Sequence, residues 1–588
     1  MDATTPLLEG GRVRHGGCSP RRWVGGVVMS IGALAMVVVF LGGSNTWLHS
    51  PLDVACRATF YPETCKATLV GMHRASPEEL TGSLVSNAAL GVRKTLATVV
   101  GNGGGGEVGL SSGERVCHQT LESSIEQLET SLATLTSVGS DVSRYPFDDL
   151  KTLLSAAMEF HTTCIDTLME TGALDQHTVD QKQHTEELLS NALAFVNALS
   201  RFGTDVRTWE RTTSVDGAPD PNSDCVKNSR RFLNRESATD GLLEEETGAF
   251  PSWMSSEQQA LLIEADPPVD VVVAKDGSGK FKTIQAAIDA APKSGKTSAK
   301  RYVIRIKAGV YDEQVTVPKQ ATNFMFIGDG AAKSTITGDR SVAKTPGMTT
   351  FLSASLIIEG AGFIGKAFAA RNTAGAEGHQ AVAMRVSADM AAFYLCAFDS
   401  WQDTLYTHTF RQYYRECTIL GTIDFIFGNG AVAFQSCAII AKKSPLLGQQ
   451  NTYTAQGKTD QGQATGLSFQ SCIFDATPEL KANTGNFKTY LGRPWKTYST
   501  HVNLKCNLMG HIDAAGWLPW NTSDFGLKTS FFAEWQDFGP GAANLGKRVW
   551  WSKQITDKNV AMKYQALPFT QANQWVPATG IPLTTSLP

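Results

Sequence analysis

Two aspartates lie 21 residues apart, each among large apolar neighbours: Asp403 in the sequence WQDTL and Asp424 in DFIFG. If folding brings two partly buried carboxylates together, they repel, so their pKa values separate and one is protonated while the other is ionised. An ionised aspartate can attack an ester carbonyl, and a protonated one can donate to the departing alkoxide and then activate water. The pair therefore indicates a hydrolytic site built on two carboxylates.

Other side chains could complete such a site. The amide groups of Gln380 and Gln402 are neutral donors suited to a tetrahedral oxyanion. Arg493, in LGRPW, can hold a carboxylate through two hydrogen bonds and keep it ionised, while Trp495 offers a flat face to a sugar ring. Each also has an ordinary structural explanation: a turn aspartate, a structural ion pair or a glutamine ladder. Spacing alone does not name the substrate.

The region from Val269 onward must position these residues. It contains short apolar runs rich in β-formers, separated by glycines and turn residues, with one helical segment at 284–291. Features recur every 20–22 residues: Gln380 to Gln402, Asp403 to Asp424, Cys396 to Cys417, and Cys417 to Cys437. A repeat of this length without helices is typical of a parallel β-solenoid, whose neighbouring strands lie about 4.8 Å apart. The repeat predicts that both aspartates and both glutamines share one outer face.

The preceding region, 53–202, is predicted to be an all-α four-helix bundle. Ser76, Pro77 and Glu79 form a helix start, and two apolar stripes follow at helical spacing. The stripes are Leu121, Ile125, Leu128, Leu132 and Leu135, then Leu188, Ala192, Phe195 and Leu199. The glycine run at 103–106 is read as a loop.

Residues 203–268 are polar and irregular, which is typical of an exposed linker. The linker contains Arg230-Arg231-Phe232-Leu233, and in a secretory protein the dibasic pair Arg230 and Arg231 is a predicted processing site. The alternative is a solvated charge pair with no such role.

Near the N-terminus, residues 23–43 carry no charge, and about 20 apolar residues span a bilayer. Arginines precede this run, so residues 1–22 are expected in the cytosol and the bulk of the chain on the other side. We favour an uncleaved type II signal anchor over a cleaved signal peptide; either sends the chain into the secretory pathway.

Cysteine spacing suggests bridges. Cys56–Cys65 and Cys117–Cys164 would staple the helical region. In the solenoid, Cys417 with Cys437 and Cys472 with Cys506 have spacings that could bridge neighbouring coils, which would leave Cys396 free and buried.

Other functions have little support in the sequence. A formal net charge of -4 and no basic stripe argue against nucleic-acid binding. There is no H-E-x-x-H, P-loop or G-x-S-x-G motif, and the histidines form no evident metal cluster. His379 is interpreted as a packing residue rather than a base. Asn521, in N-T-S, is a possible glycan acceptor.

Five ordered motifs resemble the signature of plant pectin methylesterases: GVYDE at 309–313, QAVA at 380–383, QDTL at 402–405, DFIFG at 424–428 and LGRPW at 491–495. The resemblance covers 269–588 and includes FGPG at 538–541 and WVP at 575–577. The helical region, with its four cysteines, is similar to the pectin methylesterase inhibitor domain found as a pro-region in such enzymes. Arg230-Arg231-Phe232-Leu233 is similar to the processing motif between the two parts, although Phe232 replaces the more usual Leu.

The resemblance implies an all-β right-handed parallel β-helix with a cleft for homogalacturonan, acting as a monomer and without a metal or organic cofactor. Asp403 matches the proton donor and Asp424 the nucleophile, while Gln380 and Gln402 match the oxyanion-stabilising glutamines. The positions that match substrate contacts are Thr350, Arg493 and Trp495. Trp517 is expected to stack on sugar. The implied partners are pectin, the chain's own inhibitor-like region, a processing protease and a membrane, and the implied destination is the cell wall.

Two other functions remain open at this point. A β-helix glycosidase or lyase could use the same two aspartates on a glycosidic bond of the same polymer. Alternatively, the protein could be an inhibitor or wall-binding protein whose helical bundle is the active part. Whether the bundle inhibits the β-helix or only assists its folding is also open.

Overall fold

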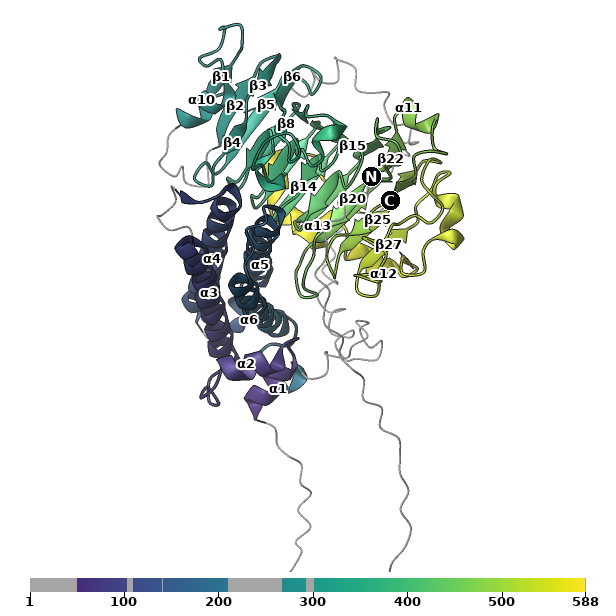
Figure 1. Ribbon diagram of the computed structural model, residues 1–588. Helices are drawn as coiled ribbons and strands as arrows, with labels where there is room; N and C mark the ends of the chain where they lie inside the picture. Colours follow the sequence, from purple (N-terminus) through teal and green to yellow (C-terminus); the bar gives the residue numbers. More distant parts are fainter. Residues whose placement is uncertain (1–49, 103–108, 140, 210–266, 292–300, 587–588) are drawn as a thin grey trace, which may run out of the picture. The chain divides into compact units, whose positions relative to one another are not determined.

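The computed structural model describes residues 50–102, 109–139, 141–209, 267–291 and 301–586. The first three ranges are helical and the last two form stacked parallel strands (Figure 1). The expected membrane span at 23–43, the glycine run and Arg230-Arg231 lie outside the described residues. In the described part, no helix has the length and apolarity to cross a membrane.

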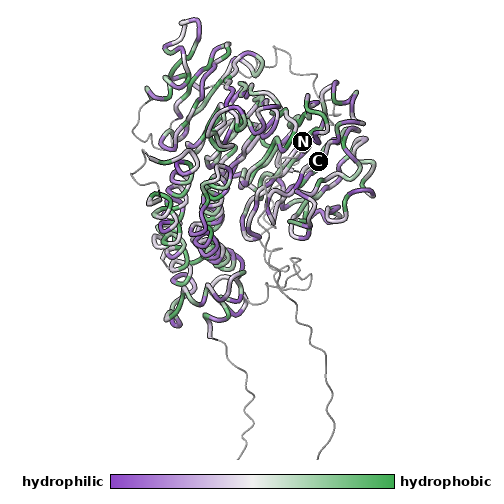
Figure 2. Tube along the Cα trace, in the orientation of Figure 1, coloured by the Kyte–Doolittle hydropathy of each residue, from purple (hydrophilic) through white to green (hydrophobic). Residues whose placement is uncertain are grey.

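Four long helices pack together as a bundle, with short helices at one end. Contacts join α3 to α4, α4 to α5, α5 to α6 and α6 back to α3, and green and purple alternate along these helices in Figure 2. The helices are α1 (Pro51–Arg57), α2 (Pro62–Thr68), α3 (Pro77–Asn102), α4 (Ser112–Val138), α5 (Phe147–Glu170), α6 (Gln176–Phe202) and α7 (Val206–Trp209). The helical region is therefore slightly longer than expected, because α7 occupies the start of the expected linker.

Local chemistry explains where α3 begins and what it packs against. The Ser76 N–H donates to Glu79 Oε2 at 2.7 Å, and the Glu79 N–H donates to Ser76 Oγ at 3.2 Å. This reciprocal cap confirms the predicted helix start. The apolar stripes lie in the bundle core as predicted, and Leu132 packs against it partly exposed. Disulfides join Cys56 to Cys65 and Cys117 to Cys164, as expected.

The second part is a parallel β-helix, which confirms the predicted solenoid. Its strands form three long parallel sheets and one short one, and the colours in Figure 1 run from teal at β1 to yellow-green at β27. The eleven-stranded sheet contains, in order, β1 (Val271–Val273), β2 (Tyr302–Ile306), β5 (Phe324–Gly328), β8 (Ile364–Lys366), β11 (Ala391–Tyr394), β14 (Arg411–Arg415), β17 (Ala431–Gln435), β21 (Gly466–Gln470), β25 (Thr500–Leu504), β27 (Phe531–Trp535) and β28 (Lys553–Gln554).

The other sheets complete each coil. The seven-stranded sheet contains β24 (Arg493–Pro494), β20 (Thr454–Gln456), β16 (Ile426–Gly428), β13 (Leu405–Tyr406), β10 (Met384–Val386), β7 (Leu356–Ile358) and β4 (Val315–Val317). The eight-stranded sheet contains β26 (Asn507–Leu508), β22 (Ile473–Ala476), β18 (Ala438–Ala441), β15 (Thr418–Gly421), β12 (Ala397–Asp399), β9 (Ala369–Asn372), β6 (Ser334–Gly338) and β3 (Gly309–Asp312). The short sheet pairs β19 (Asn451–Thr452) with β23 (Thr489–Tyr490).

Identical positions of successive coils stack inside the β-helix. The rings of Phe393, Tyr414, Phe434 and Phe469 stack with centroid separations of 4.9, 4.8 and 4.6 Å. These separations match the spacing of neighbouring strands, so each coil continues the core of the one before it. The predicted helical segment is present as α10 (Ile284–Asp289), beside the first strand.

The C-terminal residues cover the outer face of the eleven-stranded sheet. Short helices α12 (Lys558–Met562), α13 (Ala566–Thr570) and α14 (Ala572–Trp575) precede the final segment. Ala566, Trp575 and Ile581 pack in one apolar cluster with Met325 and Tyr413 of that sheet. A different sheet, the seven-stranded one, carries the candidate site.

The expected bridges between coils are wrong. Cys417, Cys437, Cys472 and Cys506 are free and buried, as is Cys396. Each of these four thiols donates to a carbonyl oxygen, for example Cys437 Sγ to Tyr414 O at 3.5 Å. Each cysteine comes one residue before a strand of the eight-stranded sheet, so the five form a row of thiols along successive coils.

Candidate active site

A row of side chains crosses the outer face of the seven-stranded sheet. The strand pairing aligns, in order, Ile357, Arg385, Tyr406, Phe427, Ala455 and Arg493. The rings of Tyr406 and Phe427 stack with centroids 4.2 Å apart. The row is a mainly apolar floor with two arginines: Arg385 pairs with Glu359 at 3.0 Å, and Arg493 stands at the end, where it suits a sugar chain carrying acidic groups.

Asp403 and Asp424 occupy the same position in successive coils. Each lies two residues before a strand, and the register Leu405↔Ile426 places them one coil apart. Both have positive φ angles, 63° for Asp403 and 50° for Asp424, in the turn that enters the sheet. Aspartate tolerates this left-handed conformation better than most residues, which allows the same turn to carry a carboxylate twice. The predicted pairing is thereby confirmed.

The Asp424 carboxylate is held from several directions. Arg493 Nε donates to Oδ1 at 2.9 Å and Nη2 donates to Oδ2 at 2.6 Å, while the Thr452 hydroxyl donates to Oδ1 at 2.5 Å. Asp424 is only 5% exposed, so these charge-assisted bonds form where water competes little. They fix the orientation of this carboxylate and place a guanidinium against both of its oxygens.

Asp403 lies in a different electrostatic environment. Burial, followed by the negative charge of Asp424, raises the pKa of Asp403 well above its usual value, although Arg493 opposes the shift. A third contribution that raises this pKa comes from Glu170, at the end of α5. Asp403 is therefore suited to carry a proton beside an ionised Asp424.

The two glutamines are neighbours, as predicted. Gln380 and Gln402 form an isolated parallel bridge, and the Ala381 N–H donates to Gln402 O at 3.3 Å. Both side chains are half-buried, and Gln402 directly precedes Asp403. Their amides are therefore available at the same surface as the aspartates.

Two predicted tryptophans differ in their surroundings. Trp495 is half-buried, directly follows β24 and lies edge-on to Phe427 at 6.0 Å, so it belongs to the floor. Trp517 is 1% exposed and packs inside the coil against His501 and Phe532 at 4.8 and 4.9 Å. The expectation that Trp517 stacks on sugar is therefore wrong, because its ring is enclosed by the core.

The sequence reasoning missed Trp520. The Arg493 guanidinium lies 4.4 Å from the centroid of the Trp520 ring, and this ring packs against the apolar cluster of the floor. The sequence WLPW at 517–520 contains both tryptophans, but no strand periodicity says which one turns outward.

Helix α5 of the bundle contacts the same face. Glu170 Oε1 accepts hydrogen bonds from the backbone N–H of Thr350 at 3.0 Å and from its hydroxyl at 2.8 Å. Asp166 accepts from Lys496 Nζ at 2.7 Å. Glu159 Oε2 accepts from Asn429 Nδ2 at 2.9 Å, one residue after β16. The predicted substrate contact Thr350 is therefore engaged by the chain's own helix.

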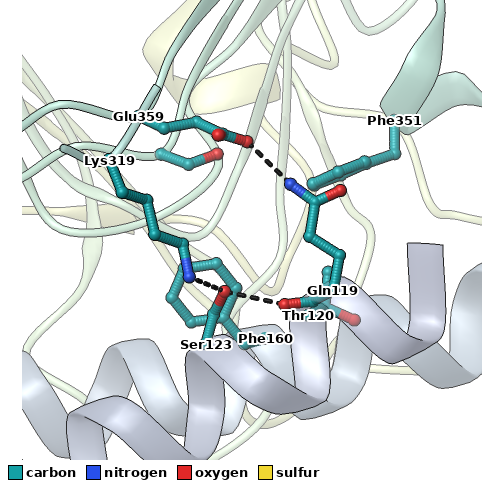
Figure 3. A pocket seen from close by; sticks show the side chains of 8 residues that line it. Gln119, Thr120, Ser123, Phe160, Lys319, Phe351 and Glu359 are labelled. Carbon is teal, nitrogen blue, oxygen red and sulfur yellow. Dashed lines mark hydrogen bonds between the residues drawn. The ribbon is translucent and has the colours of Figure 1, made fainter. Parts of the chain in front are cut away.

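Helix α4 adds a second set of contacts, shown in Figure 3. Gln119 Nε2 donates to Glu359 at 3.1 Å, and Lys319 Nζ donates to Ser123 Oγ at 2.5 Å. A small space remains between these pairs, lined also by Phe160 and Phe351. Elsewhere on α4, Val116 packs into the apolar floor with Phe351, Tyr406 and Phe427. The bundle thus meets the sheet through both polar and apolar contacts.

The remaining predictions concern other positions. Asn521 is exposed, and its Oδ1 accepts hydrogen bonds from Ser523, so its use as a glycan acceptor stays a prediction. In the ranges that the structure describes, no group of three or more His, Cys, Asp or Glu residues could hold a metal ion.

Comparison with known proteins agrees with both parts. The family model Pectinesterase matches residues 270–573, and the model Plant invertase/pectin methylesterase inhibitor matches 51–195. Pectinesterase 3 of Citrus sinensis is 38% identical over 92% of this chain and 89% of its own. Pectinesterase/pectinesterase inhibitor U1 of Solanum lycopersicum is 36% identical over 92% of this chain and 89% of its own.

Among solved structures, the pectin methylesterase from carrot is 46% identical and superimposes with a TM-score of 0.52. The match covers 98% of the carrot chain but 54% of this one, so the carrot chain is comparable in extent to the β-helix part alone. With its β-helix, its two aspartates one coil apart and relatives that span both of its parts, the chain belongs to the pectinesterase family, whose enzymes hydrolyse the esters of pectin, and carries an inhibitor-like domain before the catalytic one.

Proposed function

We propose that the chain removes methyl esters from homogalacturonan with Asp424 as nucleophile and Asp403 as general acid and base. The observation that carries this assignment is the contrast between the two carboxylates. Asp424 is bound at both oxygens by Arg493, whereas burial and its neighbour's charge raise the pKa of Asp403. One is therefore the ionised partner and the other the protonated partner.

The reaction proceeds in two balanced steps. The Asp424 carboxylate attacks the ester carbonyl carbon, Gln380 and Gln402 donate to the oxyanion, and methoxide leaves with the proton of Asp403 as methanol. Asp403, now ionised, takes a proton from water, and the resulting hydroxide attacks the Asp424 anhydride. This step releases the uronic acid, restores the Asp424 carboxylate and leaves Asp403 protonated.

The test is methanol release by the bundle-free enzyme, compared with its Asp424→Asn variant. The variant keeps the size of the side chain but removes the nucleophile, so methanol release should fall at least about a thousandfold. Asp475→Asn, at a carboxylate paired with Lys481, is the control and should retain wild-type turnover. Unchanged turnover in Asp424→Asn would reject the assignment, and shortening of the polymer without methanol would indicate glycosidase or lyase chemistry instead.

We further propose that the bundle inhibits the β-helix until the linker is cut at Arg230-Arg231. Support comes from the position of Glu170, whose carboxylate accepts both donors of Thr350 and whose charge acts on Asp403. The full chain should therefore release methanol much more slowly than residues 234–588. In the full chain, Glu170→Ala should raise the rate severalfold, whereas Glu129→Ala, at a residue paired with Arg93 within the bundle, should not. Equal activity of the full chain and the β-helix part would instead favour folding assistance.

We also propose how the protein is anchored in the membrane and where the processed enzyme is delivered. The uncharged run at 23–43 supports a type II signal anchor, and the family supports delivery of the processed enzyme to the cell wall. Labelling of an introduced cysteine on either side of intact membranes would test the orientation of the anchor. A glycan at Asn521 would appear as a mass decrease after enzymatic deglycosylation.

A further inference from the structure

Near its C-terminal end, α5 presents two carboxylates to the β-helix. Glu170 binds the N–H and hydroxyl of Thr350, and Asp166 binds Lys496 Nζ at 2.7 Å. The two acids are four residues apart, so they lie on one face of the helix, about 6 Å apart along its axis. The bundle thus offers a pair of acidic groups with a fixed spacing.

Their partners lie next to β7 and β24, which flank the strands that follow the two aspartates. Thr350 begins the short 3-10 helix η4 (Thr350–Leu352), which leads into β7, and Lys496 follows β24. The sheet order β24-β20-β16-β13-β10-β7 places the strands that follow Asp424 and Asp403 between them. Any chain bound across this sheet would therefore meet Lys496 on one side of the catalytic pair and Thr350 on the other.

The two partners differ in which carboxyl groups they can accept. The N–H and hydroxyl of Thr350 are neutral donors, which can bind either an ester carbonyl or a free carboxylate. Lys496 is a cation whose side chain is 20% exposed with the bundle in place, and its Nζ lies 5.1 Å from the centroid of the Trp495 ring. A methyl ester would desolvate this ammonium without neutralising it, whereas a carboxylate would do both.

We propose that Lys496 is a specificity-determining residue that binds a free uronate carboxylate next to the ester being cleaved, and that Asp166 occupies this carboxylate's place in the uncut chain. The proposal rests on the proposed function, because it assumes a polyuronate bound across this sheet.

The simpler alternative is that Lys496 serves only to hold the bundle. Enzyme without the bundle distinguishes these two roles, because a residue that only binds Asp166 would then have no influence on substrate choice. The experiment accordingly uses enzyme obtained from the full chain by cutting at a specific protease site introduced at 230–233, followed by separation from the bundle.

The kcat and KM of methanol release are measured on fully esterified homogalacturonan and on the same polymer after partial random de-esterification. Wild type should show a lower KM on the partly de-esterified polymer. Loss of one charge-assisted hydrogen bond, about 1.5 kcal/mol, corresponds to about a tenfold rise of this KM in Lys496→Met, with a much smaller change on the fully esterified polymer. Lys496→Arg should keep the preference, and added salt should weaken it in wild type.

Lys333→Met is the matched control, since it removes the same charge from an exposed turn between β5 and β6, and it should behave as wild type. If Lys496→Met melts at a lower temperature than wild type, Lys496→Gln replaces it. An unchanged ratio of the two KM values in the folded variant would overturn the proposal. Lys496 would then serve only to bind the bundle. Absence of methanol release by wild type would instead reject the proposed function.

Discussion

Arg493 donates a hydrogen bond to each carboxylate oxygen of Asp424, at 2.9 Å from Nε and at 2.6 Å from Nη2. The pairing joins β24 to the turn before β16, which are separated by β20 in the sheet. It fixes the position of Asp424, whose negative charge raises the pKa of Asp403. The two side chains are chemically identical, so the contacts around each aspartate decide which one is the acid and which one is the nucleophile.

The first prediction concerns the pH dependence of catalysis. Asp403 must be protonated to donate, and burial followed by the charge of Asp424 raises its pKa. The charge of Asp424 remains when the bundle is removed, so kcat/KM should fall as pH rises through that raised pKa. Asp403→Asn should lower kcat/KM at least about a hundredfold, and its residual activity should lack this alkaline limb. The measurement is a pH profile of methanol release by the bundle-free enzyme. If kcat/KM of Asp403→Asn still falls at high pH as in wild type, another group causes that fall.

The second prediction separates the two tryptophans of the 517–520 segment. Trp520 lies on the Arg493 guanidinium, and a cation–π contact of about 1 kcal/mol predicts that Trp520→Ala lowers kcat/KM about fivefold, with little change in stability. Trp517 is enclosed by the core, so Trp517→Phe should lower the free energy of unfolding by about 2 kcal/mol and leave methanol release per folded molecule unchanged. Kinetics and denaturant titration of both variants check this. The reverse pattern would mean that Trp517 contacts sugar.

The catalytic pair was predictable because in-register parallel strands convert a sequence period into a spatial distance. Asp403 and Asp424 are 21 residues apart, and the register Leu405↔Ile426 has the same offset. The start of α3 was predictable for a local reason, since Ser76 and Glu79 satisfy each other's backbone groups. Both predictions depend on residues that are near each other in the sequence: one coil apart for the aspartates and one helical turn apart for the cap.

Other features depend on directions and distances that no local pattern encodes. The spacing of Cys417 and Cys437 indicates neighbouring coils, but it does not say whether the Sγ atoms point toward each other. The contact of Glu170 with Thr350 joins residues 180 positions apart in different folds. Trp517 and Trp520 lie outside the strands, where no alternation separates inside from outside.

The third prediction concerns the thiol row. All five cysteines of the β-helix part are free and buried, so a thiol reagent should modify none of them in the folded, bundle-free enzyme and five per molecule after unfolding in denaturant. Bridges between Cys417 and Cys437 and between Cys472 and Cys506 would leave one. Mass spectrometry of the alkylated protein, unfolded without reductant, distinguishes the two numbers.

The fourth prediction concerns docking of the bundle after the linker is cut. Burial raises the pKa of Glu159 to about 8, although the hydrogen bond from Asn429 opposes the shift. When the bundle leaves, water should reach this carboxyl and return its pKa to about 4.5. The docked state then binds the extra proton between these values, so docking should weaken as pH rises through this window.

His408, 3.9 Å from Glu159, opposes this trend at low pH. Burial lowers the pKa of His408 well below 6.5, so an undocked, solvated His408 would take up a proton below pH 6.5 and weaken docking there. The two effects offset each other up to about pH 6.5. From there to about pH 8 the Glu159 effect remains, with a slope of up to tenfold in the dissociation constant per pH unit.

The measurement is the dissociation constant of the cut chain's two parts, followed by size-exclusion chromatography or titration from pH 5 to pH 8.5. Glu159→Gln keeps the contact with Asn429 but cannot ionise, so its affinity should stay nearly constant above pH 6.5. Glu126→Gln, at an exposed carboxylate that pairs with Lys319 across the same interface, is the control and should retain the wild-type pH dependence. A steep loss of affinity above pH 6.5 in Glu159→Gln would mean that another group controls release. If both variants match wild type at every pH, Glu159 is already neutralised in the free bundle by contacts within α5.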